Sequence, residues 1–96
     1  MKLKDVLQGL AIRSTAADME AEISGVSYDS RTTAPGDVFV AISGEAVDGH
    51  RFIPMAQEKG AVCVVCERAP SCDIPYVLVE NSRQALALIG GNWFDH

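Results

Sequence analysis

Two apolar runs separated by a segment with helical signals place the strongest constraint on how this chain can fold. Residues 37–42 (DVFVAI) and 61–66 (AVCVVC) are almost unbroken apolar stretches, which is typical of strands covered on both faces. Residues 51–59 between them predict a helix, because Pro54 falls in its first turn and Gly60 can end it. A strand, a helix and a strand in series predict a βαβ unit with two parallel strands and a right-handed crossover.

The rest of the chain extends this unit into a small three-layer domain. Residues 22–28 and 76–79 predict two more strands, whereas residues 11–21 are weakly patterned and are interpreted as a connector. Two further helices are predicted from apolar residues at helical spacing: Leu3, Val6, Leu7 and Leu10 in the first, and Leu86, Ile89 and Trp93 in a last helix that Ser82 can cap. We therefore expect one α/β domain over residues 1–96, with a mixed, largely parallel sheet of about four strands flanked by helices.

Length and charge limit the class of protein. The 96 residues suffice for one domain, and the net charge of −5 argues against a nucleic-acid partner, which needs a basic face. The longest apolar run, residues 61–66, is far too short to span a membrane, and Asp5 precedes any signal-like segment. We therefore expect a cytoplasmic protein with no membrane partner. The apolar end NWFDH favours a chain cut at a domain boundary.

Cys63 and Cys66 form a C-x-x-C pattern, for which redox, metal-binding and structural roles are alternatives. Within a strand, residues three apart point to opposite faces and their Cα atoms lie roughly 10 Å apart. That separation exceeds the limit of about 7 Å for a disulfide, and only Cys72 remains to help bind a metal. We interpret both cysteines as buried thiols and expect no metal site.

The chain lacks the common catalytic and phosphate-binding motifs. It contains neither G-x-x-x-x-G-K-[ST] nor G-x-G-x-x-G, and no G-x-S-x-G. Polar residues instead follow two predicted strands, at the edge where open α/β sheets bind ligands. These segments are residues 28–31 and 43–51, and the second leads into a helix N-terminus that favours an anion such as phosphate. The sequence therefore predicts a binding site without catalytic residues.

Six side chains in these segments can contact a ligand: Tyr28 by stacking on a base, Arg31 and Arg51 by charge, and Ser30, Ser43 and His50 by hydrogen bonds. Each has a structural alternative. Asp29 and Ser30 can cap their own turn, and His50 can be a capping or surface residue. Tyr28 can belong to the core, and the two arginines can be solvated surface charges.

Three motifs in series, YDSR, PGDVFVAISGE and DGHRFI, closely resemble the N-terminal domain of the Mur ligases of peptidoglycan synthesis. The later VLVENSRQALALIGGNWFDH is similar to the segment that precedes the central ATPase domain of that family. The series is most similar to the ligases of the third step, which add an amino acid to UDP-N-acetylmuramoyl-L-alanyl-D-glutamate. The ligases of the fourth step, which add D-alanyl-D-alanine, share the DSR and PGD elements and are the alternative.

The resemblance implies that this domain holds the UDP end of UDP-N-acetylmuramoyl-L-alanyl-D-glutamate. By matching motifs, Ser30 would contact the nucleotide with Tyr28 beside it, although some members have an aliphatic residue in place of Tyr28. The residues that would meet the uracil are Glu45, Ala46 and Val47.

The same resemblance assigns ATP and Mg to the central domain and amino-acid selection largely to the C-terminal domain. Neither domain is in this chain, so the resemblance implies a substrate-binding domain without a cofactor or ligase activity of its own. The alternative is a module that docks against those domains and binds nucleotide negligibly.

Overall fold

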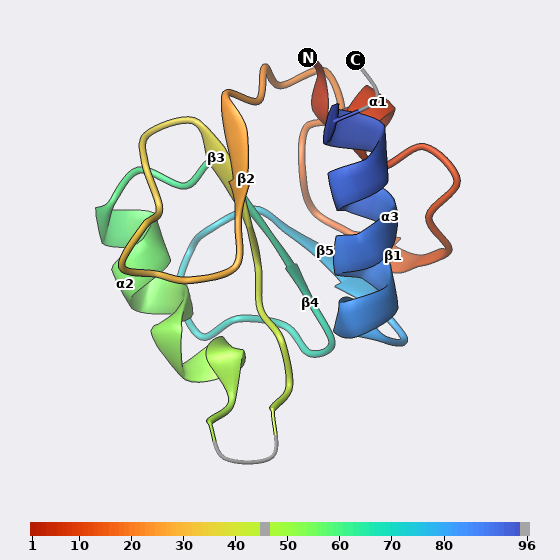
Figure 1. Ribbon diagram of the computed structural model, residues 1–96. Helices are drawn as coiled ribbons and strands as arrows, with labels where there is room; N and C mark the ends of the chain where they lie inside the picture. The colour runs from red at the N-terminus through yellow and green to blue at the C-terminus, as the bar shows by residue number, and fades with distance from the viewer. Residues whose placement is uncertain (45–46, 95–96) are drawn as a thin grey trace.

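The computed structural model describes residues 1–44 and 47–94 as a five-stranded sheet between helices (Figure 1). The elements in chain order are α1 (Leu3–Val6), β1 (Ile12–Thr15), β2 (Gly25–Ser27), β3 (Asp37–Val40), the 3-10 helix η1 (Gly49–Phe52), α2 (Ile53–Glu58), β4 (Cys63–Cys66), β5 (Tyr76–Val79) and α3 (Ser82–Phe94). The strand order is β1-β5-β4-β3-β2, with β2 to β5 parallel and β1 antiparallel. The expected mixed, largely parallel α/β sheet is confirmed, but it has five strands rather than about four.

The additional strand lies in the segment that the sequence presented as a connector. β1 pairs with β5 at one edge of the sheet, with Ile12 opposite Val79 and Thr15 opposite Val77. All four residues of β1 are exposed, so the strand buries no face. The sequence IRST therefore carries no alternation of apolar and polar residues from which a strand could be read.

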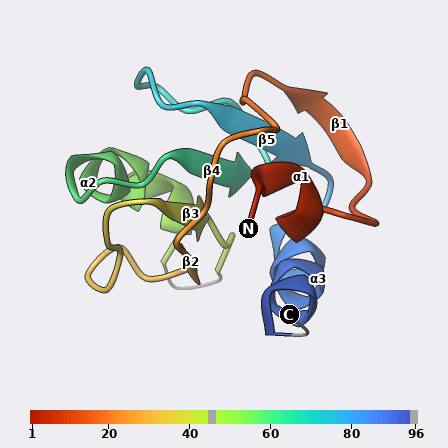
Figure 2. The ribbon, with the colours of Figure 1, turned by 90° about the horizontal axis from the view of Figure 1, so that it is seen from above.

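Helices cover both faces of the sheet, which explains the unbroken apolar runs. Val38 and Val40 of β3 pack in a core with α1 and α3, whereas Phe39 packs in a second core with α2. Figure 2, seen from above, shows α2 and α3 on different sides of the sheet. Cys63 belongs to the first core and Cys66 to the second, so the two thiols point to opposite faces as expected. No helix in residues 1–44 and 47–94 has both the length and the apolar character needed to cross a membrane.

The short edge strand β2 creates the open edge at which the candidate site lies. β2 pairs with β3 at three positions and ends opposite Phe39. Beyond that point the chain leaves the sheet in the turn that begins at Tyr28. The edge of β3 and of the residues that follow it is therefore not covered by β2.

Candidate functional site

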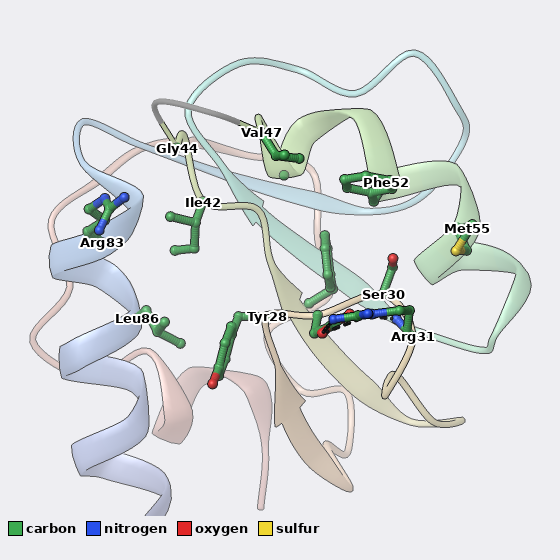
Figure 3. A pocket seen from close by; sticks show the side chains of 13 residues that line it. Tyr28, Ser30, Arg31, Ile42, Gly44, Val47, Phe52, Met55, Arg83 and Leu86 are labelled. Carbon is green, nitrogen blue, oxygen red and sulfur yellow. Dashed lines mark hydrogen bonds and ion pairs between the residues drawn. The ribbon is translucent and has the colours of Figure 1, made fainter.

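A pocket of about 840 Å³ lies at this open edge, where the carboxyl ends of β2 and β3 meet (Figure 3). Phe39 of β3 and Ile42 just beyond it line the pocket. Figure 3 shows Ile42 between α3 and the η1–α2 segment. The position agrees with the rule that open α/β sheets bind ligands outside the carboxyl ends of their strands.

The turn after β2 forms one side of the pocket and is organised by Asp29. Asp29 Oδ1 accepts a hydrogen bond from Arg31 N at 2.9 Å, and Asp29 Oδ2 pairs with Arg31 Nη2 at 2.7 Å. The Asp29 carbonyl oxygen also accepts hydrogen bonds from Thr32 N at 3.0 Å and from Thr33 Oγ1 at 3.2 Å. Hydrogen bonds from Arg31 lower the pKa of Asp29 to about 2. Asp29 therefore has the structural role of capping its own turn, and Arg31 lines the pocket with its charge already paired.

Tyr28 and Ser30 are placed differently from their neighbours in the turn. Tyr28 is 66% exposed, so it does not belong to the core, and its ring lies between the turn and α3 (Figure 3). Ser30 is buried, and its hydroxyl points toward Phe52 and Met55. None of the side-chain hydrogen bonds within the described part of the chain uses Ser30 Oγ. Both side chains line the pocket and are available to a ligand.

The loop after β3 supplies Gly44 and Val47 to the pocket, and Val47 is 52% exposed. Glu45 and Ala46, which were expected to meet a uracil, lie outside the described residues. Ser43 does not line the pocket, and its hydroxyl donates a hydrogen bond to Glu67 Oε1 at 2.9 Å.

His50 is a structural residue beside the pocket. Its ring lies 2.7 Å from Asp48 Oδ1 through Nδ1, and Nε2 accepts a hydrogen bond from Glu67 N at 2.9 Å. Because Nε2 accepts an N–H, the ring proton is placed on Nδ1, where it is donated to Asp48. Both ring nitrogens are therefore bonded within the protein, but His50 is neither a cap nor a surface residue, because it lies buried inside η1, which Asp48 caps.

Asp48 also occupies the helix end at which an anion was expected. Asp48 Oδ1 accepts a hydrogen bond from His50 N at 3.0 Å and caps η1, and the other carboxylate oxygen pairs with Arg68. The Arg68 hydrogen bond is the main reason that the pKa of Asp48 lies well below its usual range. Arg51 is exposed and does not line the pocket. A phosphate at this point would meet a carboxylate, so the anion predicted from the helix N-terminus is disfavoured here.

Glu67, which follows β4, connects three segments around the pocket. Glu67 Oε2 accepts hydrogen bonds from Ser82 N at 2.8 Å and from Ser82 Oγ at 3.0 Å, and Oε1 accepts the bond from Ser43. Its backbone N–H is the group bonded to His50. The hydrogen bond from Ser82 N is the main cause of a lowered pKa for Glu67. The residues bonded to Glu67 are direct neighbours of the pocket residues Gly44, Gly49 and Arg83.

Several pocket residues were not recognised from the sequence. α3 contributes Arg83 and Leu86, and the η1–α2 segment contributes Phe52 and Met55. Arg83 carried a usable signal, because a cation in the first turn of a helix opposes the helix dipole. The apolar residues carried none, since helical spacing does not separate pocket residues from core residues.

The lining suits the binding of a small organic ligand. Aromatic and aliphatic side chains predominate, with Ser30, Arg83 and the Asp29–Arg31 pair as the polar groups. Such a composition is typical of small-molecule sites. Within residues 1–44 and 47–94 there is no group of three His, Cys, Asp or Glu side chains that could hold a metal ion.

Comparison with known proteins identifies the family. A family model described as "Mur ligase family, catalytic domain" matches residues 22–92, well over half of the chain. The chain therefore belongs to the Mur ligase family, as its motifs indicated.

Similar sequences include UDP-N-acetylmuramoyl-L-alanyl-D-glutamate--2,6-diaminopimelate ligases. Those of Bradyrhizobium diazoefficiens and Listeria monocytogenes are 43% and 36% identical over 96 and 94 residues. Each alignment covers 98% of this chain and 19% of the relative, so the chain spans about a fifth of the length of these ligases.

Similar structures include MurF ligases, in agreement with the observed fold. A crystal structure of MurF from Acinetobacter baumannii has a TM-score of 0.70 and 27% identity, covering 94% of this chain and 19% of that protein. MurF from Thermotoga maritima in complex with ADP has a TM-score of 0.61 and 38% identity, covering 67% of this chain and 15% of that one. The α/β fold is therefore similar to the corresponding part of these ligases.

Proposed function

We propose that this domain binds the UDP end of UDP-N-acetylmuramoyl-L-alanyl-D-glutamate, as part of an ATP-dependent ligase that adds the third peptide residue in peptidoglycan synthesis. The observation that carries the proposal is the pocket at the end of β2, where Tyr28 and Ser30 are free to contact a ligand. These are the positions that the family motifs associate with the nucleotide. The similarity to ligases whose names state this substrate supports the choice of ligand.

Each proposed contact has a physical basis in the pocket. The exposed ring of Tyr28 offers an aromatic face on which a uracil can stack. Ser30 Oγ can donate or accept a hydrogen bond inside the pocket, and Val47 can pack against the ligand from the opposite loop. Glu45 and Ala46 remain part of the proposed uracil contact through the family resemblance.

The remaining chemistry of the ligase is proposed to lie in other domains. ATP, Mg and the incoming amino acid would bind there, as the family resemblance implies. The domain alone is therefore proposed to have no ligase activity.

A second candidate is the same role in a ligase of the fourth step, because the similar structures include MurF enzymes. We favour the third step because the similar diaminopimelate ligases reach 43% identity over 98% of the chain, whereas the MurF of Thermotoga maritima is 38% identical over 67% of it and that of Acinetobacter baumannii is 27% identical over 94%.

A titration of the isotope-labelled chain with UDP-N-acetylmuramoyl-L-alanyl-D-glutamate tests the proposal. We expect saturable amide shifts around Tyr28–Arg31 and Gly44–Val47, with a Kd on the order of 0.1 to several millimolar. Tyr28→Ala should weaken binding roughly 5- to 100-fold, the usual effect of losing one stacking contact. The matched control is Phe94→Ala, because Phe94 is an exposed aromatic residue outside the pocket.

ADP provides the ligand control, because it keeps the diphosphate and changes the base. Equal shifts with ADP would contradict recognition of a uridine nucleotide. An absence of shifts in a folded chain would instead favour the docking module, which needs the other domains to complete its site.

A further inference from the structure

We propose that Arg83 binds the pyrophosphate group of the nucleotide ligand in this pocket. This inference rests on the proposed function and names the residue that would recognise the anionic part of the substrate. It assigns the phosphate-binding role to α3, rather than to the η1 end that the sequence favoured.

The pairing of charges around the pocket leaves Arg83 available. Two arginines line the pocket, Arg31 and Arg83. Arg31 is held by Asp29, with Nη2 at 2.7 Å from Oδ2 and Nε at 3.0 Å from Oδ1. Within residues 1–44 and 47–94, no ion pair includes Arg83. Among the described residues, Arg83 on α3 is therefore the pocket arginine that has no acidic partner to compete with an entering anion.

The neighbouring helix ends favour the same assignment. The carboxylate of Asp48 already accepts a hydrogen bond from His50 N in η1, and the carboxylate of Glu67 already accepts one from Ser82 N at the start of α3. Both amides are therefore occupied by acidic side chains of the protein. A guanidinium, by contrast, offers several N–H donors whose geometry matches two phosphate oxygens at once. The anion is thus expected to bind a side chain rather than a helix end.

The spacing on α3 suits a nucleotide that extends along about one turn of the helix. Arg83 and Leu86 are three residues apart, so they share one face of α3 with a rise of about 4.5 Å between them. Figure 3 shows Arg83 at the start of α3 and Leu86 further along it, nearer to Tyr28. If the base of the nucleotide packs against Tyr28 and Leu86, its phosphates are directed toward the start of α3, within reach of the long Arg83 side chain.

Titrations of the chain with UDP and with uridine test this assignment, because the two ligands differ only in the diphosphate. Arg83→Gln should weaken UDP binding about 10- to 100-fold, the range expected for a lost charge-assisted hydrogen bond, and should leave uridine affinity unchanged within about twofold. Arg83→Lys should recover part of the loss, since it keeps the charge without the bidentate geometry. Arg13→Gln is the matched control, because Arg13 lies on β1 and is absent from the pocket lining.

The outcomes separate this inference from the proposed function. If the unmodified chain binds UDP and Arg83→Gln binds it equally well, the pyrophosphate assignment is wrong while uridine-nucleotide binding stands. An equal loss of uridine and UDP affinity would also overturn the assignment, since Arg83 would then only shape the pocket. If the unmodified chain binds neither UDP nor the full substrate, both proposals fail together.

Discussion

At the residue scale, Glu67 connects several segments around the pocket although it does not line the pocket itself. One carboxylate accepts hydrogen bonds from Ser43 and from both the amide and the hydroxyl of Ser82. Its own amide is bonded to the ring of His50. These contacts connect the ends of β3 and β4 to the beginnings of η1 and α3. A loss of the Glu67 side chain should therefore affect stability and the pocket together.

The lowered pKa of Glu67 allows this role to be measured through pH. A carboxyl group whose pKa is lowered on folding contributes stability above its unfolded pKa, and that contribution is lost as the pH falls through the folded pKa. We expect Glu67→Gln to lower the free energy of unfolding by about 1 kcal/mol near neutral pH. This difference from the unmodified chain should shrink once the pH falls below the ordinary pKa of glutamate, about 4.3. Urea unfolding across this range measures both.

The control for that experiment is Glu58→Gln, which removes an exposed carboxylate at the end of α2. Its effect on stability should be small, as is usual for exposed surface positions. A Glu67→Gln chain that loses stability equally at every pH would contradict an electrostatic role for this carboxylate.

At the element scale, the βαβ unit of β3, α2 and β4 depends on a close approach of two turns. Gly60, between α2 and β4, has a φ of +101°, and a Cβ at this position would lie 2.7 Å from Pro35 Cα. The carbonyl oxygen of Gly60 also accepts a hydrogen bond from Gly36 N at 2.9 Å. The end of α2 and the turn before β3 therefore pack backbone against backbone.

Gly60→Ala should consequently destabilise the chain by about 1–3 kcal/mol, because alanine is strained at positive φ and its methyl group would displace Pro35. The matched control is Gly91→Ala on α3, where a Cβ meets no atom within 4 Å. That substitution should stabilise the helix by about 0.5–1 kcal/mol. Thermal or urea unfolding of the two variants should thus shift in opposite directions. A shift of the same sign for both would contradict the packing argument.

Some of these helices and strands could be predicted from the sequence, and others could not. The apolar runs of β3 and β4 are visible because both faces of these strands are buried, and Pro54 and Gly60 mark the limits of the helix between them. The edge strand β1 is invisible because its pairing with β5 buries none of its side chains. Local motifs likewise indicated the turn at Tyr28 and Ser30. The contribution of Arg83 depends on the approach of α3 to that turn, which a local pattern does not encode.

At the scale of the whole molecule, the central position of β4 joins the two cores into one structure. Cys63 packs with α1 and α3 on one face, and Cys66 packs with α2 on the other. Burial raises the pKa of Cys63 to about 12 and that of Cys66 to about 11. Very little of either group is therefore thiolate at neutral pH in the folded state, and a C-x-x-C redox role is disfavoured.

Alkylation of the three cysteines tests whether the two helical layers, α1 with α3 on one face of the sheet and α2 on the other, open as one unit. Cys63 and Cys66 should react slowly with iodoacetamide and at the same rate. Each thiol becomes accessible only when the helices that cover its face of the sheet move away, and we expect both faces to open together. Half-buried Cys72 should react first and serves as the internal reference. In a second chain that carries Cys72→Ser, all labelling seen by mass spectrometry should come from the two cysteines of β4. Adding urea should accelerate both β4 cysteines in parallel with global unfolding. Faster labelling of one of them would contradict a single cooperative core, since the helical layer on its face would then open without the other.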